Sequence, residues 1–217
     1  MSEYHVVKDF MIRVLPEGLS LRDASLAEPL AVGLHAIEMA GGVQGKKVLV
    51  TGSGPIGLLL AAGAVAKGAA EVTCTDVLDG PLERAKAVGV QHTIRVDKEQ
   101  IPEMAYDVVF ECSGVAPAIT PAIAAVRRAG TVAQVGMLSN DKIAVNLAAF
   151  VTKEVSYIGC FRFNDEIGEA IELLASNPKI ANVITHVIAA DEIENAFDTA
   201  KNSQESGKVV VALWPEA

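Results

Sequence analysis

Short apolar runs alternate with stretches of helical pattern through the middle of the chain. The apolar runs predict strands at 47–51, 71–75, 92–96, 107–111, 130–135 and 155–159. Helices are predicted between them, at 55–67, 80–88, 98–104, 116–127 and 146–152. Uninterrupted alternation of strand and helix is typical of a parallel sheet with crossover helices. The pattern therefore predicts an α/β fold with a doubly wound, six-stranded parallel sheet.

The first part of the chain has a different pattern. Residues 1–27 combine a short alternating piece with a loop that contains Pro and Gly, and Ser20 is a candidate N-cap for the short helix that follows. An apolar helix then begins at Glu28 and Pro29 and ends at Gly41 and Gly42. We therefore expect residues 1–27 to be a remnant of another domain.

The last part of the chain also leaves the alternation. The pattern predicts a helix at 164–175, a strand at 183–188, a helix that Asp191 caps and a final strand at 208–213. These strands need a partner sheet. We therefore expect residues 164–217 to return toward the domain of residues 1–27, which leaves residues 28–163 as the strand-and-helix domain.

A Gly-x-Gly-x-x-Gly turn joins the first predicted strand to the helix after it. Gly52 would allow a tight turn, Gly54 would let the backbone approach a pyrophosphate, and Gly57 would let the helix pack closely on the strand. The amino end of the helix would then face an anion. A glycine turn without a ligand is the alternative, but the flanking strand and helix favour a dinucleotide site in a Rossmann domain.

Asp76 ends the second predicted strand, about twenty residues beyond the glycines. A carboxylate at this place can accept a hydrogen bond from the 2′-hydroxyl of a ribose and would repel a 2′-phosphate. No Arg or Lys follows within the next few residues. The sequence therefore predicts NAD, and not NADP, as the cofactor.

Further polar and small residues follow the other strands. Since the carboxyl ends of parallel strands share one edge of the sheet, this edge should carry Asp76, Glu111–Gly114, Val135–Met137 and Cys160–Phe163.

Composition and charge exclude several classes of function. The net charge is −9 without a basic cluster, which argues against nucleic acid or an anionic membrane as partner. No apolar stretch approaches the roughly 20 residues of a membrane span, and no secretory signal is visible at the start, so we predict a cytoplasmic protein. The three cysteines, Cys74, Cys112 and Cys160, lie far apart and match neither a zinc knuckle nor a disulfide framework.

Six segments, in this order, resemble the zinc-dependent medium-chain dehydrogenases: Glu28–Gly33, Gly52–Gly57, Asp76, Glu111–Gly114, Val135–Met137 and Phe161–Phe163. The polyol and sugar-acid branch fits best, that is, the sorbitol, xylitol and L-idonate 5-dehydrogenases, with the L-idonate enzymes the best match. The resemblance covers nearly the whole chain, and Glu28–Leu30 together with Phe161–Phe163 makes it specific.

The resemblance implies a role in NAD binding for the residues of the ligand edge. The pyrophosphate would lie on Gly52, Gly54, Pro55, Ile56 and Gly57. Asp76 would hold the adenosine ribose, and Cys112 and Ser113 would lie near the adenine side. The backbone that faces the nicotinamide carboxamide would be that of Val135, Gly136 and Met137.

The resemblance also implies where substrate and metal would meet the cofactor. Phe161 and Arg162, which follow Cys160, would lie where the nicotinamide meets a polyol or sugar-acid substrate, and Glu28 would lie beside the catalytic zinc and its bound water. Each has an ordinary alternative: a surface ion pair for Arg162, and a favourable contact with the helix dipole for Glu28. Two departures are Pro81, where many sorbitol dehydrogenases carry an arginine that contacts the ribose, and Phe163, where they often have tyrosine.

The zinc ligands of the family are not visible in this sequence. They belong to an N-terminal catalytic domain of roughly 120 to 150 residues, and before the glycines this chain offers only His5, His35 and acids. We therefore expect no zinc site here, with Glu28 close to the metal at most. His35, His92 and His186 are interpreted as structural.

Three classes of function remain after this comparison. The first is the cofactor-binding portion of an NAD-dependent polyol dehydrogenase, which binds NAD without turnover when isolated. The second is a stand-alone NAD-binding or sensing module without catalysis. The third, methyl transfer from S-adenosylmethionine, gives no role to Glu28 or to Phe161–Phe163. A homodimer or homotetramer is expected, paired through strand 155–159 or residues 142–145.

Overall fold

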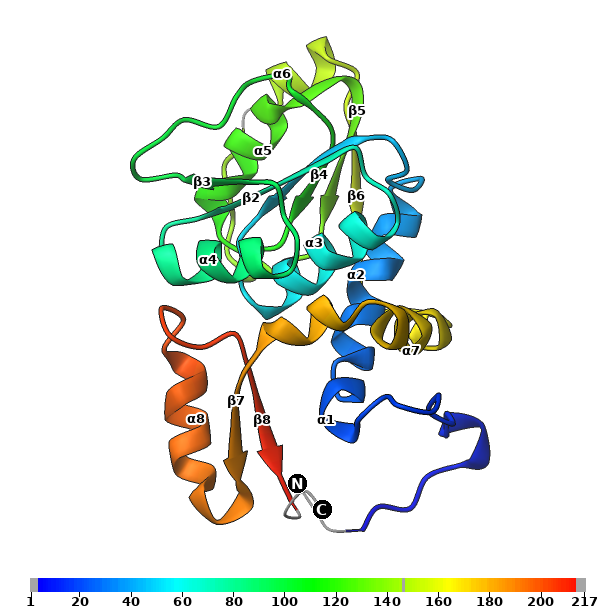
Figure 1. Ribbon diagram of the computed structural model, residues 1–217. Coiled ribbons are helices and arrows are strands. Elements are labelled where there is room, and N and C mark those ends of the chain that lie inside the picture. The colour runs from blue at the N-terminus through cyan, green and yellow to red at the C-terminus, as the bar shows by residue number, and fades with distance from the viewer. Residues whose placement is uncertain (1–3, 146, 214–217) are drawn as a thin grey trace.

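The six predicted strands form one parallel sheet in the order β3-β2-β1-β4-β5-β6 (Figure 1). The computed structural model describes residues 4–145 and 147–213. The strands are β1 (Lys47–Thr51), β2 (Glu71–Asp76), β3 (His92–Arg95), β4 (Tyr106–Glu111), β5 (Val126–Gln134) and β6 (Ser156–Gly159). Every neighbouring pair is parallel. This is the doubly wound order of dinucleotide-binding domains, in which ligands bind where the strand order reverses, next to β1.

Successive residues of the central strands enter two separate cores, one on each face of the sheet. Val48 and Val50 of β1 belong to the core under α2 (Ala27–Met39), α3 (Pro55–Ala66) and α4 (Asp79–Ala87). Leu49 belongs to the core under α5 (Ile119–Ala125), with α6 (Ala148–Thr152) beside it. Because side chains alternate along a strand, a strand covered on both faces is mostly apolar at successive positions. This property is what made these strands visible as apolar runs.

Helix α7 (Ile167–Ser176) extends the first core, because it packs against α2. After it come η3 (Pro178–Val183), β7 (Ile184–Ala189), η4 (Ala190–Glu192), α8 (Ile193–Lys201) and β8 (Lys208–Ala212). Strands β7 and β8 pair with each other in parallel and lie below the main sheet, with α8 against them (Figure 1). The two predicted strands therefore form a small sheet of their own. The division of the chain at residues 27 and 163 stays a prediction.

Several predicted helices were wrong in extent or existence. Residues 98–104 form turns and loop, because Pro102 lacks a backbone donor and Met104 has a left-handed φ of 52°. The helix predicted at 116–127 is a short 3₁₀ turn, η2 (Ala116–Ala118), followed by α5. It ends early because β5 begins at Val126, and the buried Lys153 Nζ donates to the carbonyls of Ala124 (3.0 Å) and Val126 (2.6 Å) at this junction.

The starts of three further helices were predicted with mixed success. Ser20 caps α1 (Leu21–Ala24) as predicted, since its side chain accepts a hydrogen bond from Asp23 N (3.1 Å). Asp191 does not cap α8: it lies within η4, and α8 begins at Ile193. Residue 146, predicted to start a helix, lies outside the described residues, and α6 begins at Ala148.

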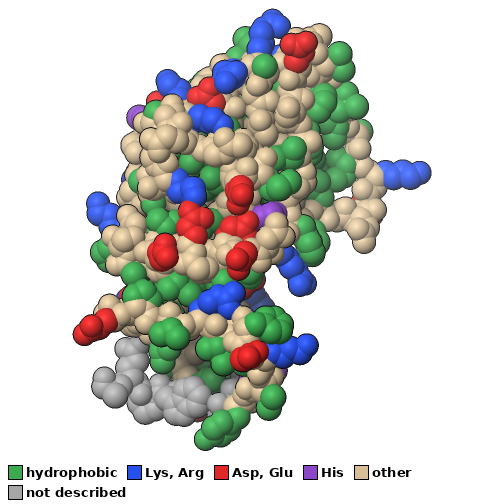
Figure 2. Space-filling view, turned by 90° about the vertical axis from the view of Figure 1, so that its right-hand side faces the viewer, with side chains coloured by type: hydrophobic (Ala, Val, Ile, Leu, Met, Phe, Trp, Pro, Cys, Tyr) green, Lys and Arg blue, Asp and Glu red, His purple; other side chains and the backbone are tan. Residues whose placement is uncertain are grey.

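The surface combines charged and apolar areas. Viewed from the side of α7, acidic and basic side chains are interspersed over the upper part, and hydrophobic side chains gather toward the lower end (Figure 2). Tyr4, Val6, Phe10 and Val14 of the first segment are strongly exposed, and so is Phe197 of α8. The alternating piece at 4–8 does not form a strand, and η1 (Asp9–Met11) follows it. None of the described helices is long and apolar enough to cross a membrane.

Helices α2 and α3 approach each other closely at Gly33, and this contact can be tested. A Cβ on residue 33 would lie 2.9 Å from Leu60 Cα. We predict that Gly33→Ala lowers the free energy of unfolding by about 1–3 kcal/mol, because overpacking outweighs the helical preference of alanine. Gly168→Ala in α7 is the matched control, since a Cβ there meets no atom within 4 Å. Urea unfolding of the two variants should give opposite signs or at least a clear difference; equal effects would contradict the close packing.

Candidate functional site

The three glycines of the turn after β1 serve three different purposes. Gly52 has a φ of +85°, and a Cβ on it would lie 2.7 Å from Ser113 Cα. A Cβ on Gly57 would lie 1.9 Å from the carbonyl oxygen of Gly52, so α3 packs onto the turn only because residue 57 has no side chain. A Cβ on Gly54 would meet no atom within 4 Å. The turn is therefore closed on two sides and open at Gly54, where α3 begins with Pro55 and Ile56.

Asp76 is fixed beside this turn by backbone donors. Its Oδ2 accepts a hydrogen bond from Ser53 N (2.9 Å), in the middle of the glycine turn. Its Oδ1 accepts from Val77 N (2.8 Å) and Leu78 N (3.0 Å). The carboxylate is therefore held in one orientation at the end of β2 and lies next to the opening at Gly54.

A buried carboxylate, Glu111, organises the loops after β4 and β5. Its Oε1 accepts a hydrogen bond from Ser113 N (2.8 Å) and one from the Ser113 hydroxyl. Its Oε2 accepts from Gln134 Nε2, which also donates to the carbonyl of Gly136 (2.7 Å). The Tyr157 hydroxyl of β6 donates to Gln134 Oε1. A buried carboxylate is stable only with several such donors. Ser113 and Gln134 supply them, and Tyr157 extends the network to a third strand, β6.

Sequence reasoning placed Glu111 at the ligand edge but did not assign it this role, and it missed Gln134 and Tyr157. The available signal was a charged residue at the last position of a buried strand, directly before a Cys-Ser-Gly turn. Such a residue needs buried partners, and their identity depends on which strands become neighbours.

The loops after β4 and β5 also touch through their glycines. A Cβ on Gly136 would lie 2.3 Å from Gly114 N, and a Cβ on Gly114 would lie 2.7 Å from Met137 O. Val135 N and Gly136 N both donate to the carbonyl of Glu111, at 2.9 and 2.7 Å. The structure therefore brings Ser113–Gly114 and Val135–Met137 together, as the sequence predicted, with the Met137 side chain exposed.

The cysteines near this edge are protonated thiols. Burial raises the pKa of Cys74 to about 12 and that of Cys112 well above its ordinary value, and burial also raises the pKa of Cys160. Only the deprotonated thiolate is a good nucleophile or metal ligand. Since these thiols are protonated, we interpret them as packing groups. Cys112 packs close to Gly57, and Cys160 N donates to the carbonyl of Gln134 (2.9 Å).

Phe161 and Arg162 follow β6 and are both exposed. Arg162 has a left-handed φ of 56°, and its Cζ lies 5.2 Å from the centre of the Phe161 ring, a cation–π contact. No ion pair joins Arg162 to another residue within the described ranges. The surface ion pair considered from the sequence is therefore not found there, and the guanidinium faces solvent.

Glu166 anchors the loop that carries Phe161 and Arg162. Its Oε2 accepts a hydrogen bond from Asn164 N (2.7 Å), and its Oε1 lies 2.7 Å from Nδ1 of the buried His35 in α2. Burial raises the pKa of Glu166, but the hydrogen bonds from His35 and from backbone amides outweigh it and leave the pKa below its ordinary value. His35 is a packed histidine, as predicted. His92 begins β3 and His186 lies in β7, also as predicted.

Glu28 lies exposed in the first turn of α2. Among the described residues none forms an ion pair with its carboxylate, and its position in the first helical turn is favourable for the helix dipole. Within residues 4–145 and 147–213, no three His, Cys, Asp or Glu side chains lie close enough to hold a metal ion. These residues therefore do not fit a catalytic zinc, which needs three protein ligands.

The strand order, the open glycine turn and the anchored acid define a dinucleotide-binding Rossmann domain. The family model described as zinc-binding dehydrogenase matches residues 55–176, more than half of the chain. The chain belongs to the zinc-binding dehydrogenase family. The medium-chain dehydrogenase resemblance is thereby confirmed.

Curated relatives support the polyol branch of this family. The chain is 34% identical to D-xylulose reductase of Saccharomyces cerevisiae, over 98% of this chain and 63% of the relative. It is 36% identical to sorbitol dehydrogenase of Bos taurus, over 86% of this chain and 55% of the relative. The chain therefore spans little more than half the length of such relatives.

Solved structures give the same picture. L-idonate 5-dehydrogenase from Escherichia coli superposes with a TM-score of 0.84 at 29% identity, over 92% of this chain and 59% of that chain. A zinc-binding dehydrogenase from Sinorhizobium meliloti, solved bound to NADP, superposes with a TM-score of 0.82 at 26% identity, over 91% and 61%. The Sinorhizobium meliloti relative therefore binds a nicotinamide dinucleotide.

The depressed pKa of Glu166 predicts how stability depends on pH. A carboxyl whose folded pKa lies below its unfolded pKa stabilises the fold above the unfolded value and loses this contribution as pH falls through the folded pKa. We predict that Glu166→Gln lowers the free energy of unfolding by about 1–3 kcal/mol near pH 7. The difference from the parent protein should shrink below about pH 4.

Urea unfolding at several pH values measures this difference. Glu169→Gln is the control, because Glu169 lies on the same helix and forms a partly exposed pair with Lys67. The control should change the free energy by less than about 1 kcal/mol. A difference for Glu166→Gln that stays constant from neutral to acid pH would show that its charge is not involved.

Proposed function

We propose that this chain is the NAD-binding part of a polyol dehydrogenase, in which hydride passes from a secondary alcohol to the nicotinamide ring. The observation that carries the proposal is the opening at Gly54, with the amino end of α3 on one side and the anchored carboxylate of Asp76 on the other. An exposed helix amino end suits an anion, and an adjacent fixed carboxylate suits a ribose hydroxyl.

In this proposal the cofactor extends along the carboxyl edge of the sheet. The pyrophosphate lies on the turn from Gly52 to Gly57, since the backbone at Gly54 has open space beside it, next to the amino end of α3. The adenosine ribose donates to Asp76, with Cys112 and Ser113 toward the adenine side. The nicotinamide carboxamide meets the backbone of Val135–Met137, which the Glu111 hydrogen bonds hold in place.

Substrate recognition is assigned to the exposed Arg162 beside Phe161. A guanidinium is always charged and offers a fork of donors that fits a carboxylate or two hydroxyl oxygens. The similarity to D-xylulose reductase, sorbitol dehydrogenase and L-idonate 5-dehydrogenase favours a polyol or a sugar acid such as L-idonate. The bound cofactor supplies the hydride acceptor, and Arg162, held by its contact with Phe161, orients the alcohol toward it.

The metal chemistry of the family lies outside this assignment. Because the described residues do not gather three ligands, we assign no step to zinc in this chain, and Glu28 is at most a neighbour of the metal. The homodimer or homotetramer expected from the sequence stays a prediction that light scattering can test. The cytoplasmic location stays a prediction as well, which fractionation of the source cells can test.

Cofactor binding is the direct test of the proposal. We predict that the chain binds NAD at least about tenfold more tightly than NADP, since Asp76 repels a 2′-phosphate. Gly54→Ala should weaken NAD binding about tenfold or more, because its Cβ enters the space for the pyrophosphate. Isothermal calorimetry measures both. Folding should be unaffected, since residue 54 has a φ of −68° and its Cβ meets no neighbour.

Two controls make this titration decisive. Gly168→Ala, in α7, should leave NAD affinity unchanged. Urea unfolding of Gly54→Ala should match the parent within about 0.5 kcal/mol. Equal affinity of the parent for NAD and NADP would refute the assignment of Asp76, and undiminished NAD binding by Gly54→Ala would refute the site.

Catalysis should be absent in the isolated chain. We predict no NADH formation from sorbitol, xylitol or L-idonate, with or without added zinc, because nothing described here replaces a Lewis acid worth several kcal/mol. Elemental analysis after dialysis against a mild chelator should find no stoichiometric zinc. One zinc ion per chain, or zinc-dependent turnover, would place the metal chemistry within these residues.

A further inference from the structure

An arginine, Arg95, lies next to Asp76 at the adenosine end of the proposed site. The two residues are register partners at the carboxyl ends of the neighbouring parallel strands β3 and β2. Val96 N donates to the carbonyl of Asp76 (3.1 Å), which holds the two strand ends together. In the sequence Arg95 lies about twenty residues beyond Asp76. The prediction from the sequence considered only the residues directly after Asp76 and therefore missed this arginine.

Two carboxylates occupy the guanidinium of Arg95. Its Nε and NH2 donate to the two oxygens of Asp97, at 2.9 and 3.2 Å, and its NH1 donates to Asp79 Oδ2. Asp97 lies in the turn after β3, and Asp79 is the first residue of α4. Both carboxylates are about half exposed, whereas the Arg95 side chain is 22% exposed. The hydrogen bond from Arg95 lowers the pKa of Asp97, so this partner remains charged at neutral pH.

The other arginine of this region, Arg84, is committed to the backbone. Its NH1 and NH2 donate to the carbonyls of Gln204 (3.2 Å) and Ser203 (2.6 Å), in the loop before β8. Releasing Arg84 would therefore detach this loop from α4. Arg95 differs, because its partners are exposed side chains that can be changed without removing a backbone contact.

We propose that Asp79 and Asp97 determine cofactor specificity together with Asp76, by occupying Arg95 so that it cannot receive a 2′-phosphate. The proposal rests on the proposed NAD-binding function. A phosphate next to β2 needs a cation, and a guanidinium binds phosphate through paired donors. With Nε, Nη1 and Nη2 of Arg95 already donating to carboxylates, NADP meets repulsion from Asp76 without compensation from Arg95. Removing the carboxylates turns the same arginine into a phosphate ligand.

A stepwise series of variants tests this inference by calorimetric titration of NAD and NADP. Starting from Asp76→Ser, which removes the repulsion, adding Asp97→Asn should tighten NADP binding about tenfold, the gain expected from one charge-assisted phosphate contact. Adding Asp79→Asn should tighten it further. NAD affinity should change less than about twofold between these variants, since NAD carries no 2′-phosphate. Arg95→Gln in the same background should abolish the gain.

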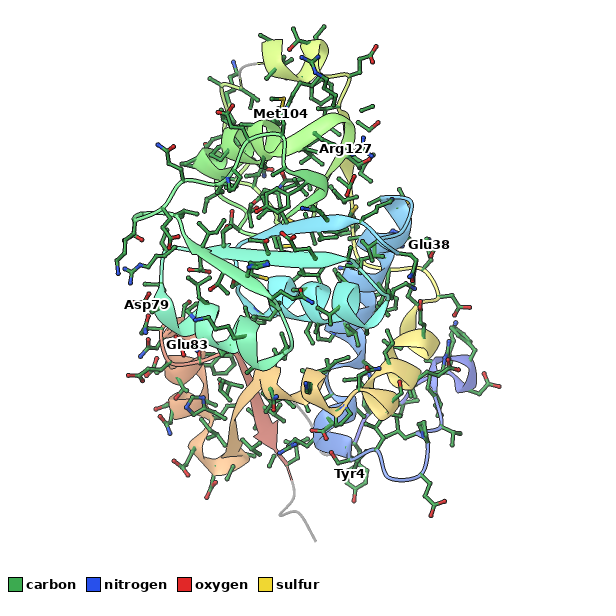
Figure 3. The ribbon with its side chains drawn as sticks, turned by 45° about the horizontal axis from the view of Figure 1, so that its top comes forward. Tyr4, Glu38, Asp79, Glu83, Met104 and Arg127 are labelled. Atoms are coloured by element: carbon green, nitrogen blue, oxygen red, sulfur yellow. The ribbon has the colours of Figure 1, made fainter. Side chains whose placement is uncertain are left out.

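A matched control removes a similar ion pair elsewhere. Asp107 Oδ1 accepts a hydrogen bond from Arg127 Nε (2.5 Å), and its Oδ2 accepts one from Lys47 N (2.7 Å), which asparagine can retain through its oxygen. Asp107→Asn therefore removes the charge partner of an arginine on β5. Arg127 and Asp79 lie at separate places on the molecule (Figure 3). Combined with Asp76→Ser, Asp107→Asn should leave NADP affinity unchanged. An equal gain from this control, or a gain that survives Arg95→Gln, would overturn the inference and indicate a general effect of net charge.

The experiment separates this inference from the function on which it rests. If the parent chain binds NAD but NADP affinity does not rise in the Asp97→Asn and Asp79→Asn variants, the inference alone is wrong. If the parent chain binds neither dinucleotide, both are wrong. Urea unfolding of each variant identifies any that lose binding through instability. If Asp79→Asn unfolds the protein, Asp97→Asn still tests the inference, because Asp97 lies in a turn and its substitution does not alter α4.

Discussion

The position of α3 depends on the contact between residue 57 and the carbonyl of Gly52. Any side chain at residue 57 would overlap this oxygen, so glycine there fixes how closely the helix lies on β1. Helix α2 in turn packs on α3 at Gly33, and α7 packs on α2. The amino end of α3 is thus directed at the carboxyl edge of the sheet by a stack of helices, and the loop with Phe161 and Arg162 is attached to the same stack through Glu166 and His35.

Most of the fold could be predicted because the sheet is covered on both faces. The middle of each central strand is then apolar on both faces, as at Val48–Val50 and Val108–Phe110, and a continuous apolar run is visible without knowing its neighbours. The errors lie where local signals compete with tertiary contacts. Residues 98–104 have a helical pattern, but Pro102 interrupts it. Strand β5 starts at Val126 because it pairs with β4, and no local signal announces that pairing.

The parts of the candidate site that could be predicted are those formed by residues adjacent in sequence. The glycine turn is a contiguous motif, and each glycine reports a backbone constraint at its own position. The Glu111 carboxylate depends on Gln134 of β5, which Tyr157 of β6 holds in turn, and Arg95 depends on carboxylates from the turn after β3 and from α4. Asp97 is close to Arg95 in sequence, but Asp79 meets Arg95 only because α4 packs beside β3, and Arg95 becomes a neighbour of Asp76 only through strand pairing.

The two ends of the site are held by different kinds of interaction, with different consequences for change. At the nicotinamide end, Glu111 is fully buried, so removing a partner would leave a charge without compensation inside the protein. That end is rigid and difficult to alter. At the adenosine end, Arg95 is paired with half-exposed carboxylates, and such pairs contribute only about 0–1 kcal/mol to stability. In the proposed site, the preference between NAD and NADP can therefore change through a few exposed charges, while the backbone proposed to face the nicotinamide is preserved.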